Sequence, residues 1–190
     1  MDASFWHQRW ASRDIGFHES EANQLLVTHF HALELEQGAR VFIPLCGKSR
    51  DIAWLLAQGY NVVGAELNEG AVRELFEELG IEPVVSVGDN HIRYYERGID
   101  VLVGDVFDIS TAVLGDVDAV YDRAALVALP SVMRKQYTEH IQRVTSRAPQ
   151  LLICYEYDQS LMKGPPFSIV GDEIRTHYAA NYEITQLEHR

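Results

Sequence analysis

Strand-like and helix-like segments alternate between residues 40 and 80, and this pattern constrains the fold more than any other feature of the chain. Short apolar runs occupy residues 40–45 and 60–67. Residues 49–59 and 69–80 carry apolar side chains at helical spacing, and each stretch ends in a glycine. Strands that alternate with helices in this way are typical of a parallel sheet with helices on both faces. We therefore expect a doubly wound α/β fold.

The rest of the chain continues this pattern less regularly. Apolar and β-branched runs predict strands, and amphipathic stretches predict helices. The expected strands are 84–87, the two arms of a hairpin at 92–96 and 99–107, a strand within 116–126, and 150–158 and 182–188, and the expected helices are 131–145 and 171–178. The 190 residues have the length of one domain, which we assign to 1–190.

The first 35 residues differ from the rest in being rich in aromatic side chains and histidine. We expect a helix from Glu19 to Leu33, preceded by an aromatic segment that folds over the domain as a flap. Trp6 and Trp10 lie four residues apart, so a helix would place them on one face. For Trp6 we favour packing in the core.

Composition narrows the possible ligands and the compartment. The chain has 16 basic and 28 acidic residues and a net charge of −12, which disfavours binding to nucleic acid through bulk charge. Two cysteines, Cys46 and Cys154, are too few for a disulfide framework and suit a reducing compartment. The chain starts without a signal-peptide pattern and has no apolar run long enough to cross a bilayer. We expect a cytoplasmic protein that does not bind membranes.

The triplet Gly47-Lys48-Ser49 resembles the end of a phosphate-binding loop. A Walker A loop needs another glycine five positions before Gly47, where this chain has Phe42 inside an expected strand. The dinucleotide fingerprint, with three spaced glycines, also fails, because residues 44–49 contain one glycine. The loop is therefore unsuited to a triphosphate or to NAD, and Lys48 and Ser49 become residues at the start of a helix.

Three features still indicate a ligand site at this loop. It follows the first strand and precedes a helix, where open parallel sheets bind ligands. Gly47 lets the backbone approach a ligand closely. Glu66 ends the second strand, from which a carboxylate can reach two ribose hydroxyls, although a solvated glutamate is the alternative. A ribose-binding acid without a phosphate loop suits S-adenosylmethionine (SAM), whose cationic sulfonium favours acidic and aromatic surroundings.

Other polar residues stand where strands end or in helices. Asp122 and Arg123 end a strand at the ligand edge of the sheet, and the alternative to a site is a salt-bridged surface pair. His29 and His31 are two residues apart, unlike the four-residue spacing of a helical zinc pair, so we expect no metal site.

Several segments together resemble thiopurine S-methyltransferases of the bacterial branch. They occur in the family's order over almost the whole chain: "FWHQRW" (5–10), "GFH" (16–18), "VFIPLCGKSRDIAWLLAQGYNVVGAELNE" (41–69), "GDVFDI" (104–109), "DAVYDRAALVALP" (118–130) and "YDQSLMKGPPFSI" (157–169). The resemblance implies a Rossmann-like sheet with helices on both faces that binds SAM and releases S-adenosylhomocysteine, with residues 1–35 covering the cofactor site. It implies methyl transfer to the sulfur of aromatic or heterocyclic thiols such as 6-mercaptopurine.

The resemblance also assigns residues to the cofactor. It implies that Trp10 packs near SAM, that Leu45 gives a backbone contact beside Gly47, and that Glu66 binds the ribose. The segment "GDVFD" matches the part that flanks adenine, so Asp105 and Val106 are candidates there. For Asp105, a turn role at the strand end is the alternative.

On the acceptor side, the resemblance places Arg123 between cofactor and substrate, and Phe17 as a lid. Pro166 belongs to a proline pair that would form an apolar wall for a planar ring. Arg123 cannot be a base at neutral pH, so its expected work is to hold an anionic thiolate or a water.

The expected reaction is an in-line displacement in which the enzyme positions the acceptor sulfur and excludes water. Aromatic thiols ionise readily, so we expect no residue that acts as a catalytic acid or base. The alternatives are another small acceptor, such as a selenium, tellurium or other thiol compound, or a SAM-binding protein without catalysis. We expect a monomer with a small-molecule partner. Members of the family continue past the segment that matches 182–190, so we expect a sheet that lacks its last antiparallel strand.

Overall fold

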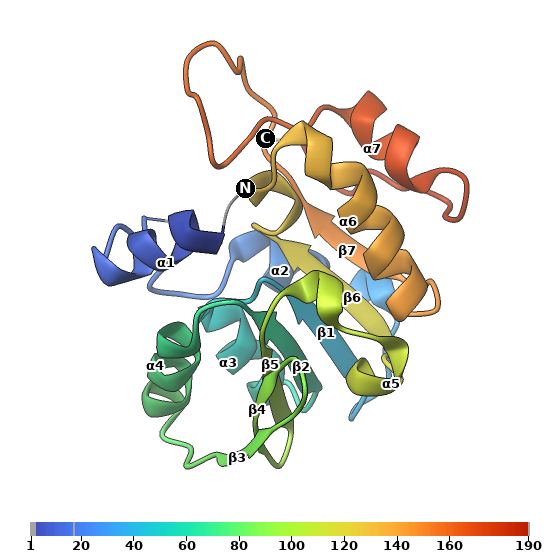
Figure 1. Cartoon of the computed structure of the whole chain (residues 1–190). Coiled ribbons are helices and arrows are strands. Elements are labelled where there is room, and N and C mark those ends of the chain that lie inside the picture. The colour runs from blue at the N-terminus through green and yellow to red at the C-terminus, as the bar shows by residue number, and fades with distance from the viewer. Residues whose placement is uncertain (1–2, 17, 190) are drawn as a thin grey trace.

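The strands form one mixed, mostly parallel sheet. A computed structural model of the chain describes residues 3–16 and 18–189, and within them the sheet has seven strands in the order β3-β4-β5-β2-β1-β6-β7 (Figure 1). The strands are β1 (Arg40–Pro44), β2 (Asn61–Glu66), β3 (Val84–Val87), β4 (Ile92–Glu96), β5 (Ile99–Val103), β6 (Ala119–Arg123) and β7 (Gln150–Ile153).

Helices connect and cover these strands. The α-helices are α1 (Ala3–Ala11), α2 (Gln24–His29), α3 (Arg50–Ala57), α4 (Glu69–Leu79), α5 (Thr111–Leu114), α6 (Ser131–Val144) and α7 (Gly171–Tyr178). The described residues also form three short 3-10 helices, η1 (Phe30–Leu33), η2 (Val106–Asp108) and η3 (Leu126–Ala128).

The centre of the sheet is parallel and one margin is antiparallel. Strands β5, β2, β1, β6 and β7 run parallel to one another, whereas β3 and β4 add an antiparallel hairpin beside β5. The central strands are buried on both faces, which explains their unbroken apolar runs. The structure thus confirms the expected doubly wound α/β fold. The hairpin expected from 92–96 and 99–107 is formed by β4 and β5, although β5 already ends at Val103.

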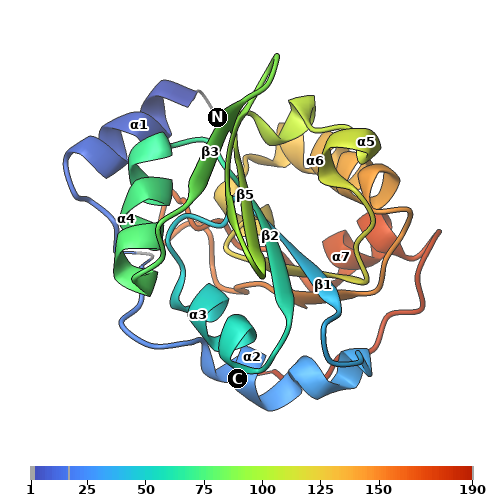
Figure 2. The same ribbon diagram turned by 90° about the horizontal axis from the view of Figure 1, so that it is seen from below.

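Two apolar cores lie on opposite faces of the sheet. Helices α2, α3 and α4 pack on one face through side chains such as Leu26, Ile52 and Phe76. Helices α5, α6 and α7 cover the other face, through Leu114 and Tyr137 among others (Figure 2). Because crossover helices cover both faces, the carboxyl ends of the strands are left as the place where a ligand can enter.

The expected helix over residues 19–33 is wrong in its bounds. The α-helix begins only at Gln24, because the Asn23 side chain accepts a hydrogen bond from the Leu25 N–H and caps it. It ends at His29, and a 3-10 helix continues to Leu33. The aromatic segment before it is itself a helix, α1.

The expected strand over 182–188 is also wrong. Alternating apolar residues suggested a strand, but this segment makes no strand pairing. It is held by side chains: the Tyr182 hydroxyl accepts a hydrogen bond from Gln150 at 2.9 Å, and Glu188 lies 2.6 Å from His29. Side-chain contacts, rather than the backbone hydrogen bonds of a sheet, thus hold residues 182–188.

In the described residues, no helix has both the length and the apolar character needed to cross a bilayer.

Gly64 in β2 provides a test of how the loop after β1 packs. A Cβ atom at this position would lie 2.7 Å from the sulfur of buried Cys46. We expect Gly64→Ala to lower the free energy of unfolding by about 1–3 kcal/mol through overpacking. In a Cys46→Ala background the cost should shrink, and urea denaturation of the four proteins measures both values. An equal cost in the two backgrounds would contradict this packing.

Candidate functional site

A cavity of about 350 Å³ lies where the central strands end. This volume falls within the usual range for a small-molecule site. Leu45 follows β1, Glu66 ends β2, Asp105 follows β5 and Arg123 ends β6, and all four line the cavity. Its other lining residues include Ala3, Trp6, Trp10, His18, Glu19, Cys46, Gly47, Asp51, Val106, Phe107, Tyr121, Met133, Tyr155, Pro165 and Pro166. The strand ends and the N-terminal helix therefore enclose one site.

The Glu66 carboxylate organises the floor of this cavity. One oxygen accepts the Gly47 N–H and the other accepts the Asn68 N–H, each at 2.8 Å. Burial raises the pKa of Glu66, while hydrogen bonds from the Asn68, Gly47 and Leu67 N–H groups act in the opposite direction. A carboxylate oxygen has two lone pairs, so both oxygens keep acceptor capacity toward the cavity.

The loop between β1 and α3 has an unusual backbone. Leu45 has a φ of 50° and Gly47 a φ of 53°. The left-handed region is uncommon for leucine, and such residues often occur at functional sites. A Cβ atom at Gly47 would lie 3.2 Å from the Trp10 ring, so the bare backbone lets α1 approach the loop. Trp6, expected in the core, is half-buried and also lines the cavity.

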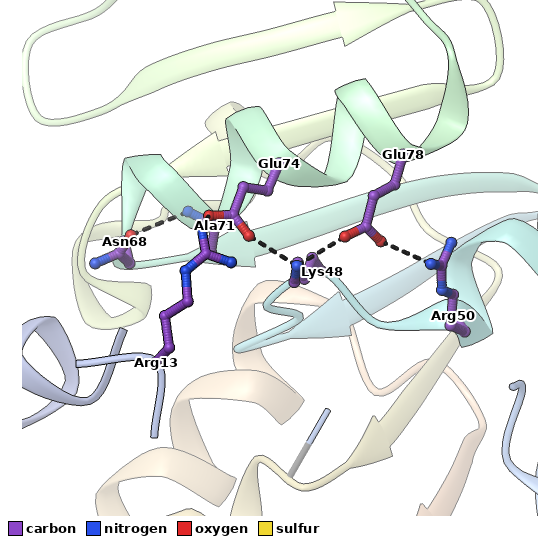
Figure 3. Close-up of polar contacts among 7 residues, drawn as sticks. All are labelled: Arg13, Lys48, Arg50, Asn68, Ala71, Glu74 and Glu78. Carbon is purple, nitrogen blue, oxygen red and sulfur yellow. Dashed lines mark hydrogen bonds and ion pairs between the residues drawn. The ribbon is translucent and has the colours of Figure 1, made fainter. Parts of the chain in front are cut away.

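Lys48 also lines the cavity, and its ammonium group reaches helix α4. Its Nζ lies 2.7 Å from carboxylate oxygens of both Glu74 and Glu78 (Figure 3). Burial acts to lower the pKa of Lys48, but the hydrogen bonds that its ammonium donates to these two glutamates outweigh burial, and the pKa is raised. Arg50 and Arg13 extend the network to the same two glutamates. The ammonium group is thus neutralised within the protein.

Ser49 begins helix α3, as expected for the residues after Gly47. Its hydroxyl accepts a hydrogen bond from the Asp51 N–H at 3.2 Å and caps the helix. With Lys48 paired and Ser49 capping, the Gly-Lys-Ser triplet has a structural explanation that needs no phosphate.

For Asp105 the sequence predicted either a contact to adenine or a role in a turn, and the structure shows the turn role. Its side chain accepts a hydrogen bond from the Phe107 N–H at 2.9 Å and caps η2. Asp105 nevertheless faces the cavity, together with buried Val106 and half-buried Phe107. An acidic group beside apolar side chains forms this wall.

Asp122 and Arg123 do not form the surface pair that was the alternative interpretation. Asp122 is buried and accepts hydrogen bonds from the Tyr137 hydroxyl and the Leu126 N–H, and burial raises its pKa to about 6. Arg123 points into the cavity and pairs with Glu19, with 2.6 Å between Nη2 and Oε1. Successive strand residues face opposite sides of a sheet, which separates the two side chains.

The polar residues of the cavity that sequence reasoning missed include Glu19, Asp51 and Tyr121. Asp51 is buried and accepts hydrogen bonds from the Asn23 N–H at 2.7 Å and the Tyr121 hydroxyl at 2.9 Å. An acid in the first turn of a helix indicates only a favourable interaction with the helix dipole. Glu19 pairs with Arg123, which lies far away in the sequence, so no local pattern indicated that Glu19 belongs to the site.

The remaining predicted residues were expected on the acceptor side. Pro166 lines the cavity from the loop after β7, and its carbonyl accepts a hydrogen bond from the Tyr157 hydroxyl. Phe17 lies outside the described residues. His18 lines the cavity, and its pKa is lowered, first by burial and then by nearby Lys48. Among the described residues, no group of three or more His, Cys, Asp or Glu side chains is placed to hold a metal ion.

Comparisons with known proteins agree on one family. The family described as thiopurine S-methyltransferase (TPMT) matches residues 1–190. Thiopurine S-methyltransferase of Xanthobacter autotrophicus is 53% identical over 189 residues, which cover 99% of this chain and 89% of the relative. The enzyme of the same name from Teredinibacter turnerae is 50% identical over 190 residues, which cover 100% of this chain and 88% of the relative.

A solved structure shares the fold at low sequence identity. It is a 1,6-didemethyltoxoflavin-N1-methyltransferase of Burkholderia thailandensis with bound S-adenosylhomocysteine and 1,6-didemethyltoxoflavin. The TM-score is 0.64 at 17% identity, and the match covers 94% of this chain and 74% of the other. The fold is therefore that of SAM-dependent methyltransferases.

Proposed function

Since the chain belongs to the thiopurine S-methyltransferase family, we propose that the cavity at the strand ends holds SAM against Glu66 and the acceptor thiol against Arg123. The activity is SAM-dependent methyl transfer to sulfur, as the family and its curated relatives establish. Our proposal concerns which residues bind each ligand, and names 6-mercaptopurine as an acceptor. The observation that carries it is the Glu66 carboxylate, which anchors the Gly47 loop and still faces the cavity.

The chemistry of the cavity fits the cofactor. Glu66 keeps acceptor capacity on both oxygens for the two ribose hydroxyls. Val106 and Phe107 offer apolar surface for the adenine ring, beside the acceptor group of Asp105. Trp10 offers an aromatic face that attracts a sulfonium by about 0.5–2 kcal/mol. Leu45 and Gly47 would contact the cofactor through their backbone.

The chain's own contribution to the reaction is to position the acceptor and exclude water. SAM supplies a methyl group on a sulfonium, which an acceptor sulfur can displace in line. Arg123 holds the acceptor through a permanent charge, and Pro166 closes the apolar side of the site, where the family resemblance also predicts Phe17 as a lid. Aromatic thiols lose their proton readily, so we assign no side chain the role of general base.

We also infer how the protein works in the cell. We assign residues 1–190 to one domain, in which residues 1–35 cover the cofactor. We infer a cytoplasmic monomer that acts on small thiols rather than on nucleic acid. The net charge of −12 and the two cysteines, neither of which forms a disulfide among the described residues, support this inference.

Replacing Glu66 by glutamine tests the cofactor site. The neutral amide loses the charge-assisted hydrogen bonds to the ribose, so SAM affinity should fall by about 10-fold to 100-fold. Titration calorimetry measures this change. The control is Glu69→Gln, which makes the same replacement on α4 outside the cavity. Unchanged SAM affinity in Glu66→Gln would contradict the assignment.

Replacing Arg123 by alanine tests the acceptor site. We expect kcat/KM for 6-mercaptopurine to fall by about 10-fold or more, because a charge-assisted contact to the acceptor is lost, while SAM affinity changes little. Transfer from labelled SAM measures turnover. Arg175→Ala on α7 is the control, since Arg175 lies outside the cavity. Equal kinetics in Arg123→Ala and the wild type would exclude the acceptor role, and no transfer by the wild type would contradict 6-mercaptopurine as an acceptor.

A further inference from the structure

The ion pair between Glu19 and Arg123 occupies the acceptor side of the cavity. A terminal nitrogen of the Arg123 guanidinium lies 2.6 Å from one oxygen of Glu19, and both residues line the cavity. Glu19 belongs to the segment between α1 and α2, whereas Arg123 ends β6. The guanidinium of Arg123, to which we assign acceptor binding, is therefore already paired with a carboxylate of the protein itself.

The two partners differ strongly in exposure. The Arg123 side chain is 8% exposed and the Glu19 side chain 46%. A half-exposed carboxylate can return to water at little cost, whereas a buried guanidinium left without an anion carries a large desolvation penalty. The pair can therefore be broken from the Glu19 side, provided that another anion takes the place of Glu19.

The other groups around Arg123 leave room for such an exchange. Asp51 is buried nearby, but its two oxygens already accept hydrogen bonds from the Asn23 N–H and the Tyr121 hydroxyl. Burial acts to lower the pKa of Arg123, and the charges of Asp51 and Glu19 outweigh it and raise the pKa. The buried Arg123 Nε–H finds no acceptor among the described residues, so Glu19 uses only part of the donor set.

We propose that Glu19 is an internal competitor for Arg123 that determines specificity, weakening the binding of acceptors with an acidic group and favouring neutral aromatic thiols. This inference rests on the proposed function, because it assumes that acceptors bind beside Arg123. An acidic acceptor must displace Glu19 and exchange one ion pair for another, so its carboxylate adds little to the binding free energy. A neutral acceptor leaves the pair intact and accepts hydrogen bonds from guanidinium N–H groups that Glu19 does not use.

The test compares two ligands that differ only in charge. These are 4-(methylthio)benzoate and 4-(methylthio)benzamide, which lack a thiol proton and so isolate the effect of the carboxylate. Calorimetry with saturating S-adenosylhomocysteine measures their affinities for the wild type and for Glu19→Gln. We expect Glu19→Gln to bind the benzoate about 10-fold more tightly, with the benzamide changed less than about twofold.

Two further variants show whether Arg123 causes this gain. Glu21→Gln makes the same replacement at an exposed position outside the cavity and should bind both ligands as the wild type does. In Glu19→Gln combined with Arg123→Ala, the gain for the benzoate should disappear. If Glu19→Gln does not fold, judged by its S-adenosylhomocysteine affinity, Glu19→Ala replaces it in the same comparison.

The outcomes separate this inference from the proposed function. Equal benzoate affinity in the wild type and Glu19→Gln, an equal gain for both ligands, or no benzoate binding by either protein would each overturn the role of Glu19. Methylation of 6-mercaptopurine by the wild type is measured alongside. If it occurs while the affinities stay equal, the proposed function stands and the inference about Glu19 fails.

Discussion

The site depends on one interaction, the hydrogen bond from the Gly47 N–H to the buried Glu66 carboxylate. It joins the loop after β1 to the end of β2, so two neighbouring strands present a fixed backbone and a fixed carboxylate to the same cavity. The other oxygen of Glu66 holds the Asn68 N–H at the start of α4. A buried carboxylate is costly unless it is hydrogen-bonded, and these backbone donors make its burial possible.

The remaining charges of the site are largely neutralised inside the protein. Lys48, which resembles a phosphate ligand in sequence, is held between two glutamates of α4. Arg123 is held by Glu19. The cavity therefore offers the carboxylate of Glu66 as a hydrogen-bond acceptor, apolar and aromatic walls, and a cation that is already paired. This arrangement suits a nucleoside sulfonium and a planar thiol better than a polyphosphate.

Sequence reasoning found what local patterns determine. The alternation around residues 40–80 gave the parallel sheet, and strand-end position pointed to Glu66 and Arg123, because parallel strands bring their carboxyl ends to one edge. The partner of Arg123 and the glutamates around Lys48 depend on side chains that meet only after folding. The strand expected over 182–188 failed for the same reason, since alternation shows a strand's propensity but not whether a neighbouring strand is there to pair with it.

The central claim is that the loop at Gly47 binds a nucleoside sulfonium and not a phosphate group. Titration of the wild-type protein with SAM and, separately, with ATP tests it most directly, because both ligands carry adenosine and differ in the group attached to it. We expect saturable binding of one SAM per chain and no measurable binding of ATP. ATP binding as tight as that of SAM would contradict this claim.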